Sequence, residues 1–166
     1  MSRGKKRCIL IGLVLFFGLW QGHALPADNP GTRKTLHGAE QIKVVVEPLK
    51  WAIENAGLKT AQLRTDTELK LRLAGIRVVS PNDPGKPSLH VNVRVIKFGQ
   101  RDRYVFNIAV EFIQTVSLER NPRVKIDATT WSTAVTGTSH KLSTVRDQVG
   151  ELVDVFINAY LSVNPD

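Results

Sequence analysis

The sequence predicts an α+β fold in which two helices cover one face of a mainly antiparallel sheet. Residues 88–136 alternate apolar and polar side chains, as three consecutive long strands with one buried face would. Short polar turns separate these strands, which favours antiparallel neighbours in a meander. Residues 57–75 and 142–160 repeat apolar residues at the helical spacings of three and four. A two-layer sandwich accommodates all of these features.

The meander divides into strands and turns by its pattern. Its first strand ends at a turn over residues 99–103. The alternation in the second strand slips at Ile113, where a β-bulge would absorb the extra residue. Residues 119–123 form the second turn, which includes Pro122 because proline has no amide hydrogen for a sheet ladder. The third strand then runs over residues 124–136.

The segments before the meander supply further elements. Residues 42–46 form a β-branched run, which predicts an N-terminal strand in the same sheet. Trp51 follows this strand and is expected to fill the core. Residues 77–79 are a short strand. Residues 81–87 contain three prolines and a glycine and are therefore a loop.

The first predicted helix, residues 57–75, has a cap signal at each end. Thr60 is the expected N-cap, and Gly75 suits the left-handed conformation just past the C-terminus. Residues 69–73 also alternate as a strand would, but helix-forming residues and the closing glycine favour a helix. The helix has two apolar stripes, made of Leu63, Thr67, Leu71 and Ala74, and of Leu69, Leu73 and Ile76.

The C-terminal helix has the clearest periodicity in the chain. Charged and polar residues occupy the side opposite its apolar stripe, and Ser143 or Thr144 is the expected N-cap. A helix of ~20 residues is ~30 Å long, which matches the predicted strands and favours packing along them. The stripe consists of Leu142, Val145, Val149, Leu152, Val153, Phe156 and Tyr160.

The N-terminal residues have the layout of a secretory signal peptide. Four basic residues precede an uncharged apolar run over 8–20, and small residues then suit cleavage after Ala24. The run is short for a bilayer span, which needs ~20 residues, and an uncleaved membrane anchor is the alternative. We expect a secreted or periplasmic protein with residues 1–24 removed. A mobile N-terminal segment over 25–40 and a single domain over 41–166 would follow.

Removal of the signal peptide changes the charge of the chain. The signal peptide holds four of the 23 Lys and Arg and none of the 15 Asp and Glu, so the formal net charge falls from +8 to +4. A mildly basic secreted domain is a weak candidate for nucleic-acid binding, and we expect none. The only cysteine, Cys8, lies within the first 24 residues, so the mature chain has no thiol for a disulfide, metal or nucleophile.

No stretch has the spacing of a catalytic or metal-binding motif, and we predict no catalytic residue, metal site or cofactor. The three histidines of the mature chain, His37, His90 and His140, lie in separate segments, and His90 is expected on the solvated face of its strand. The alternative is a secreted hydrolase whose catalytic groups are dispersed in the sequence. The residues to inspect for it are Glu111, Asp127, Thr130 and Ser132.

Basic side chains gather at the two turns of the meander. These residues predict a surface for an anionic partner, such as an anionic lipid, an acidic glycan or an envelope protein. The alternative is that they only keep the turns and the sheet edges soluble. Arg94, Lys97, Arg101 and Arg103 flank the first turn, and Arg120, Arg123 and Lys125 flank the second.

The element order is strand, helix, short strand, three long strands, helix. This order resembles small bacterial envelope proteins, among them the lipopolysaccharide-assembly lipoprotein and the N-terminal domains of some periplasmic assembly factors. The resemblance covers most of the mature chain, rests on element order alone and implies a plug, scaffold or docking protein. The chain departs from the lipoprotein pattern because no cysteine follows its apolar run. We expect a non-enzymatic binding, scaffold or envelope-assembly domain.

Overall fold

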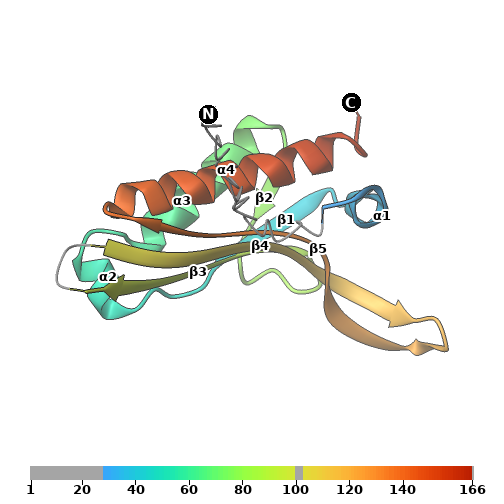
Figure 1. Cartoon of the computed structure of the whole chain (residues 1–166). Coiled ribbons are helices and arrows are strands. Elements are labelled where there is room, and N and C mark those ends of the chain that lie inside the picture. Colours follow the sequence, from blue (N-terminus) through green and yellow to red (C-terminus); the bar gives the residue numbers. More distant parts are fainter. Residues whose placement is uncertain (1–27, 100–102, 166) are drawn as a thin grey trace, which may run out of the picture.

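The computed structural model describes residues 28–99 and 103–165. The predicted signal peptide lies outside these residues. Over the described part, five strands form one sheet and helices pack on one of its faces (Figure 1). The strands are β1 (Gln41–Val46), β2 (Arg77–Val79), β3 (Ser88–Phe98), β4 (Arg103–Leu118) and β5 (Asn121–Ser139). The helices are α1 (Pro30–Arg33), the 3-10 helix η1 (Lys34–Leu36), α2 (Trp51–Asn55), α3 (Thr60–Leu73) and α4 (Leu142–Leu161).

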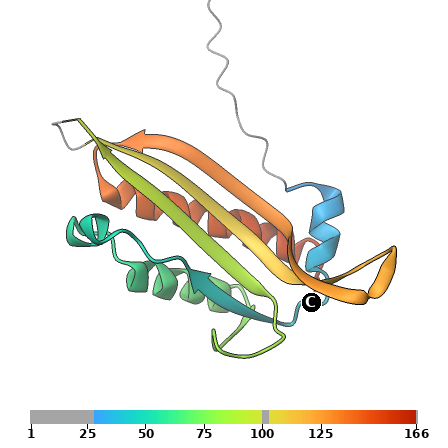
Figure 2. The ribbon, with the colours of Figure 1, turned by 90° about the horizontal axis from the view of Figure 1, so that it is seen from below.

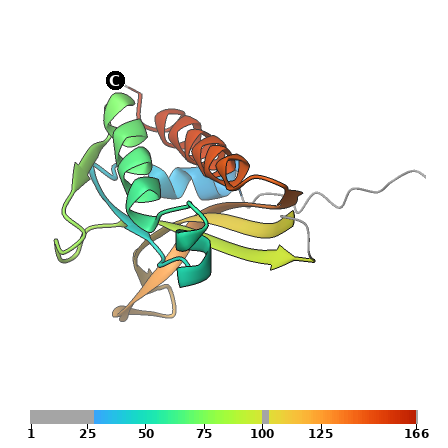
Figure 3. The same ribbon diagram turned by 90° about the vertical axis from the view of Figure 1, so that its left-hand side faces the viewer.

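The strands follow the order β2-β1-β3-β4-β5 across the sheet. β3, β4 and β5 are antiparallel neighbours, so the predicted meander is confirmed. β1 lies parallel to both β2 and β3, and α2 and α3 form the long crossover that joins the parallel pair β1 and β2. α3 and α4 cover one face of the sheet (Figure 3). The opposite face is not covered by them (Figure 2). The predicted α+β class is thereby confirmed.

Aromatic rings occupy the centre of the core between sheet and helices. Phe156 of α4 is fully buried. Its ring centroid lies 5.7 Å from that of Phe112 in β4 and 5.2 Å from that of Trp131 in β5. These spacings are typical of favourable aromatic pairs. The apolar stripe predicted for α4 therefore faces the sheet, as the periodicity indicated.

The C-terminus of α3 is closed as the sequence predicts. Gly75 has a φ of 79°, a conformation that costs glycine little because it has no Cβ. The amide of Ile76 donates to the carbonyl of Leu71 at 2.9 Å, and the amide of Gly75 donates to the carbonyl of Arg72 at 3.1 Å. This pair of bonds is the Schellman motif, and Ile76 is buried beside it.

The predicted N-caps of both long helices are wrong. α3 begins at Thr60 itself, whose amide and hydroxyl both donate to the carboxylate of Glu54, at 3.1 and 2.6 Å. These two bonds lower the pKa of Glu54, the hydroxyl bond most. α4 begins before Ser143 and Thr144, because Lys141 is the residue that precedes its first turn. Groups outside the local sequence pattern thus set where α3 starts.

Two predicted core assignments are also wrong. Leu71 is buried, but Leu69 and Leu73, in the second predicted stripe of α3, are exposed because the sheet and α4 cover only one stripe. Trp51 begins α2 and is 78% exposed, whereas Ile53 of the same short helix is buried. A five-residue helix can turn only one side toward the core, and Ile53 lies on that side.

Residues 30–36 form helical turns, whereas the sequence predicts a mobile segment over 25–40. Asn29 begins α1 with a capping box, and Leu36 is fully buried. Gln114 of β4 donates its side-chain amide to the carbonyl of Thr35 at 2.9 Å. The sequence pattern missed this docking because a single buried leucine has no periodicity.

The same segment is bonded to the C-terminus of the chain. Asn164 accepts a hydrogen bond of 2.8 Å from the amide of Gly38 and donates one of 3.1 Å to the carbonyl of Leu36. The Nδ1 atom of His37 lies 2.7 Å from the carbonyl oxygen of Val163. The residues before β1 and those after α4 therefore hold each other in place.

β4 and β5 continue past the helices as a two-stranded arm, defined here as residues 113–129 (Figures 1 and 2). The arm starts at a register shift between Phe112 and Ile113, so a bulge lies at the predicted position, but its extra residue is Thr130 of β5. The predicted turn over residues 119–123 is too long, because β5 already begins at Asn121. Pro122 lies in β5, where a second register shift leaves it without a strand partner, so its missing amide hydrogen costs no ladder bond.

Candidate docking surface at the first hairpin

β3 is longer than its neighbour β1, so part of β3 is a sheet edge. Val46 and Val91 are the last pair of residues between the two strands. The amide of Glu47 makes one further bond, of 3.0 Å, to the carbonyl of Val91. Pro48 has no amide hydrogen to continue the ladder, and the chain turns away into α2. Residues 92–98 of β3 therefore have a strand neighbour only in β4.

A groove of about 450 Å³ runs along this edge, and we call it the free-edge groove. One wall is β3 from Asn92 to Ile96, and the other is formed by residues 47–50 and by Ile53 of α2. Its apolar lining includes the buried Leu49 and Ile53. Its exposed charged side chains are Glu47, Lys50 and Arg94. The groove thus combines an unpaired strand edge, apolar side chains and a small excess of positive charge.

Large apolar side chains are exposed around the same end of the molecule. Ile96 and Phe98 in β3 are 62% and 63% exposed, and Val105 lies directly opposite Ile96 in β4. Trp51 follows Lys50 of the groove in sequence. Scattered exposed apolar residues are ordinary, but a cluster of them marks an interaction site. We call the free-edge groove and these four residues together the hairpin-end surface.

The basic residues predicted as one anionic-partner surface form two separate groups. Arg94, Lys97 and Arg103 lie at the hairpin end, on β3 and the start of β4. Arg120, Arg123 and Lys125 lie in the arm, and β4 spans the distance between the groups. Arg101 lies outside the described residues. The structure therefore brings the first group, and not the second, to the hairpin-end surface.

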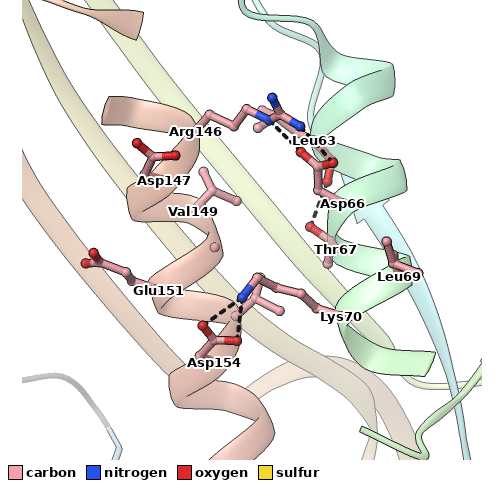
Figure 4. A pocket seen from close by; sticks show the side chains of 12 residues that line it. Leu63, Asp66, Thr67, Leu69, Lys70, Arg146, Asp147, Val149, Glu151 and Asp154 are labelled. Carbon is pink, nitrogen blue, oxygen red and sulfur yellow. Dashed lines mark hydrogen bonds and ion pairs between the residues drawn. The ribbon is translucent and has the colours of Figure 1, made fainter. Parts of the chain in front are cut away.

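A groove of about 580 Å³ lies between α3 and α4 (Figure 4). Arg146 of α4 reaches across it to Asp66 of α3, with a shortest N–O distance of 2.7 Å. Lys70 of α3 reaches back to Asp154 of α4, also at 2.7 Å. The carboxylate bond to Arg146 raises the pKa of that guanidinium. These half-exposed ion pairs connect the two helices, and solvent screens them.

No group of three or more His, Cys, Asp and Glu side chains within residues 28–99 and 103–165 could hold a metal ion. His90 contacts two other polar groups instead. Its Nε2 atom lies 3.1 Å from the Oγ of Ser88, and its Nδ1 atom lies 3.7 Å from a carboxylate oxygen of Glu47. The second distance is too long for a hydrogen bond.

The residues to inspect for a hydrolase do not form a site together. His90, Glu111 and Ser132 stand side by side on three neighbouring strands, with the carboxylate in the middle. The imidazole and the hydroxyl are therefore two strand spacings apart, ~9–10 Å, and a histidine base could not reach that serine. Asp127 is in the arm, where it accepts a hydrogen bond from Thr115, and Thr130 accepts one from the amide of Gln114.

The membrane-anchor alternative concerns residues outside the described part. Within the part that the structure describes, no helix is both long and apolar enough to cross a bilayer. The longest, α4, carries an apolar stripe with charged residues opposite it, so it is amphipathic and not apolar all round.

No protein-family model and no curated protein matches the chain. Among solved structures it is similar to a PelC dodecamer variant from Paraburkholderia phytofirmans, at 17% identity and a TM-score of 0.43, over 76% of this chain and 86% of that one. A second PelC dodecamer from Paraburkholderia phytofirmans gives 19% identity and a TM-score of 0.42 over the same shares. A minor lipoprotein from Acinetobacter baumannii gives 12% identity and a TM-score of 0.30, over 76% of this chain and 94% of that one. We transfer no function from any of the three to this chain.

Proposed function

We propose that this chain is a non-enzymatic binding or assembly domain of the cell envelope, and that it binds a partner protein through the hairpin-end surface. The observation that carries the proposal is that Lys50, Arg94 and Ile96 line one groove, and that Trp51 and Phe98, which follow close by in sequence, are large and exposed. Trp and Arg are the residue types that contribute most at protein interfaces. The secreted or periplasmic location rests on the layout of the first 24 residues.

A protein partner fits this surface better than a lipid surface does. Anionic membranes attract clusters of several Lys and Arg, and their contribution is about 1 kcal/mol for each residue. Here the exposed aromatic and aliphatic side chains border a groove and a sheet edge, which are features with defined shape. A flat lipid headgroup layer has no groups that would fill such a groove.

The test compares two exposed apolar residues with the same exposed fraction. Trp51 and Leu73 are each 78% exposed, but only Trp51 belongs to the hairpin-end surface. Each is replaced by serine in the secreted protein, and proteins from the envelope fraction are retrieved with photo-crosslinking. We expect Trp51→Ser to lose a crosslinked partner that the wild type and Leu73→Ser retain. Equal retrieval by all three would refute the proposal, as would exclusive binding to anionic vesicles.

A secreted hydrolase is the second candidate, and one contact favours it. His90 stands between Ser88 and Glu47, which is the order of a nucleophile, a base and an orienting carboxylate. Against it, Ser88 is only 7% exposed and the His90–Glu47 distance is 3.7 Å. A fluorophosphonate probe decides the matter. Labelling of the wild type that Ser88→Ala abolishes would establish a hydrolase, and absence of labelling would leave the binding domain.

A further inference from the structure

We propose that the free-edge groove binds an extended, acidic segment of a partner protein as an additional strand of the sheet, beside β3. The proposal rests on the proposed function and specifies its mode: main-chain hydrogen bonds to β3 hold the partner, and charge selects it. Strand addition to an exposed sheet edge is a general mode of peptide recognition.

The direction of the peptide groups along β3 supports this mode. The amides of Lys43 and Glu47 donate to the carbonyls of Pro87 and Val91, so the odd-numbered peptide groups of β3 point toward β1. Even-numbered groups point to β4, because the two sides of a strand alternate. Val93 and Val95 therefore direct their amides and carbonyls to the side where β1 has already ended.

The groove has the position that a continued β1 would have occupied. Its walls run along residues 92–96 of β3, a length of ~16 Å at ~3.3 Å per residue, so that it takes about five residues of an extended chain. A strand bound there would pair with the open edge of β3 and form hydrogen bonds with the peptide groups of Val93 and Val95. A globular surface could not approach these groups between the two walls.

The side chains of the groove indicate which segment it selects. On the helix side, an added strand would contact the apolar Leu49 and Ile53, so alternate residues of the segment are apolar. The exposed cations Lys50 and Arg94 outnumber the one exposed anion, Glu47, along the groove. Acidic residues at the remaining positions of the segment would therefore be favoured.

The arm of a second copy is a poor occupant for the same reason. It is an extended segment with the exposed apolar residues Val124 and Ile126. However, it carries Arg120, Arg123 and Lys125, and like charges across an interface are unfavourable. Charge complementarity thus disfavours the arm of another copy and favours an acidic segment of a different protein.

The probe for this proposal is an acetylated, amidated peptide of five Val-Asp repeats, labelled with a fluorophore. Its binding to the full-length secreted protein is measured by fluorescence anisotropy at low salt, and hydrogen exchange of the backbone amides is followed by NMR. We expect saturable binding that slows exchange at Val93 and Val95. A peptide of five Val-Lys repeats should bind at least about fivefold more weakly, since exposed charge pairs differ by up to ~1 kcal/mol.

Two controls separate main-chain pairing and charge from other kinds of binding. N-methylation of every second residue of the probe removes the amide donors along one edge, and it should abolish binding if the peptide is held as a strand. Arg94→Glu should reverse the preference between the Asp and Lys peptides. Arg123→Glu, which changes the same charge in the arm, should leave that preference unchanged.

The outcomes distinguish this proposal from the proposed function. Loss of the envelope partner in Trp51→Ser, together with peptide binding that N-methylation does not affect, would keep a docking domain and overturn strand addition. Absence of Val-Asp peptide binding, or protection at residues other than Val93 and Val95, would also overturn it. Protection of these amides that rises with protein concentration, without peptide, would assign the edge to a second copy and overturn the acidic partner.

Discussion

The carboxylate of Asp28 accepts a hydrogen bond of 3.0 Å from the indole nitrogen of Trp131, a residue 103 positions later in the chain. The same carboxylate accepts two bonds of 2.7 Å from the guanidinium of Arg33. These bonds lower the pKa of Asp28, and the bonds from Arg33 have the largest effect. Burial of the carboxylate opposes the shift, and the bond from Trp131 adds to it. A charged group thus ties the segment before β1 to the aromatic core.

We expect Asp28 to stabilise the fold at neutral pH more than in acid. A carboxyl group with a lowered pKa in the folded state contributes stability above its unfolded pKa of ~3.9, and this is lost as the pH falls through the folded pKa. Asp28→Asn should therefore reduce the free energy of unfolding more at pH 7 than at pH 3. Urea denaturation of both proteins at the two pH values measures the difference, and an equal loss at both would contradict the expectation.

The aromatic centre of the core predicts a large effect of Phe156→Ala. Truncation of a fully buried phenylalanine leaves a cavity and costs ~3–5 kcal/mol. A domain of this size has only ~5–15 kcal/mol in total, so the melting temperature should fall clearly. Asn158→Ala, two residues further on the exposed side of α4, should change it little. A larger loss from Asn158→Ala would mean that α4 faces the sheet differently.

We expect the protein to lose stability when a side chain is added at Gly137 in β5. A Cβ atom at this position would lie 2.7 Å from the Cζ of Phe106, its cross-strand partner, whose ring is buried. Overpacking of this kind costs ~1–3 kcal/mol, so Gly137→Ala should destabilise the protein in thermal unfolding. Adding Phe106→Leu should make the combined loss smaller than the sum of the single losses. Thr136→Ala, at the exposed neighbour, is the control, and a strictly additive pair would argue against the close contact.

We expect the domain to fold without most of the arm. Its residues contribute nothing to the buried core of the described part, and a two-stranded ribbon has little stability of its own. Replacing residues 115–127 by Asn-Gly joins Gln114 to its partner Ala128 through a tight hairpin. We expect a folded protein with a melting temperature within a few degrees of the wild type by circular dichroism. Failure to fold would show that the arm is part of the cooperative unit.

The sequence predicted the fold well because the long elements bury side chains at regular intervals, and this produces a regular pattern of apolar residues. β3, β4 and α4 each bury one side over many residues, and their alternation or helical spacing is therefore visible. Trp51 was misassigned because α2 is too short for its buried side to be read from a period. The cap of α3 was misplaced because Glu54, from another element, sets where α3 begins.

The candidate docking surface was predictable only in part. Arg94 and Arg103 were expected near the first turn, but no local pattern shows that the edge of β3 stays open. That openness depends on the lengths of two strands that are far apart in sequence: Pro48 ends the β1 ladder, while β3 continues to Phe98. Comparing these two lengths would have indicated the edge, once the pairing of β1 with β3 was known.

The bonds between Asn164, Gly38 and Leu36 have a practical consequence for handling the protein. They hold the residues before β1 against the C-terminal end of α4, while the other end of α4 lies at the hairpin end (Figure 1). A tag, a fusion or an immobilising surface at the C-terminus would therefore leave the hairpin-end surface unobstructed.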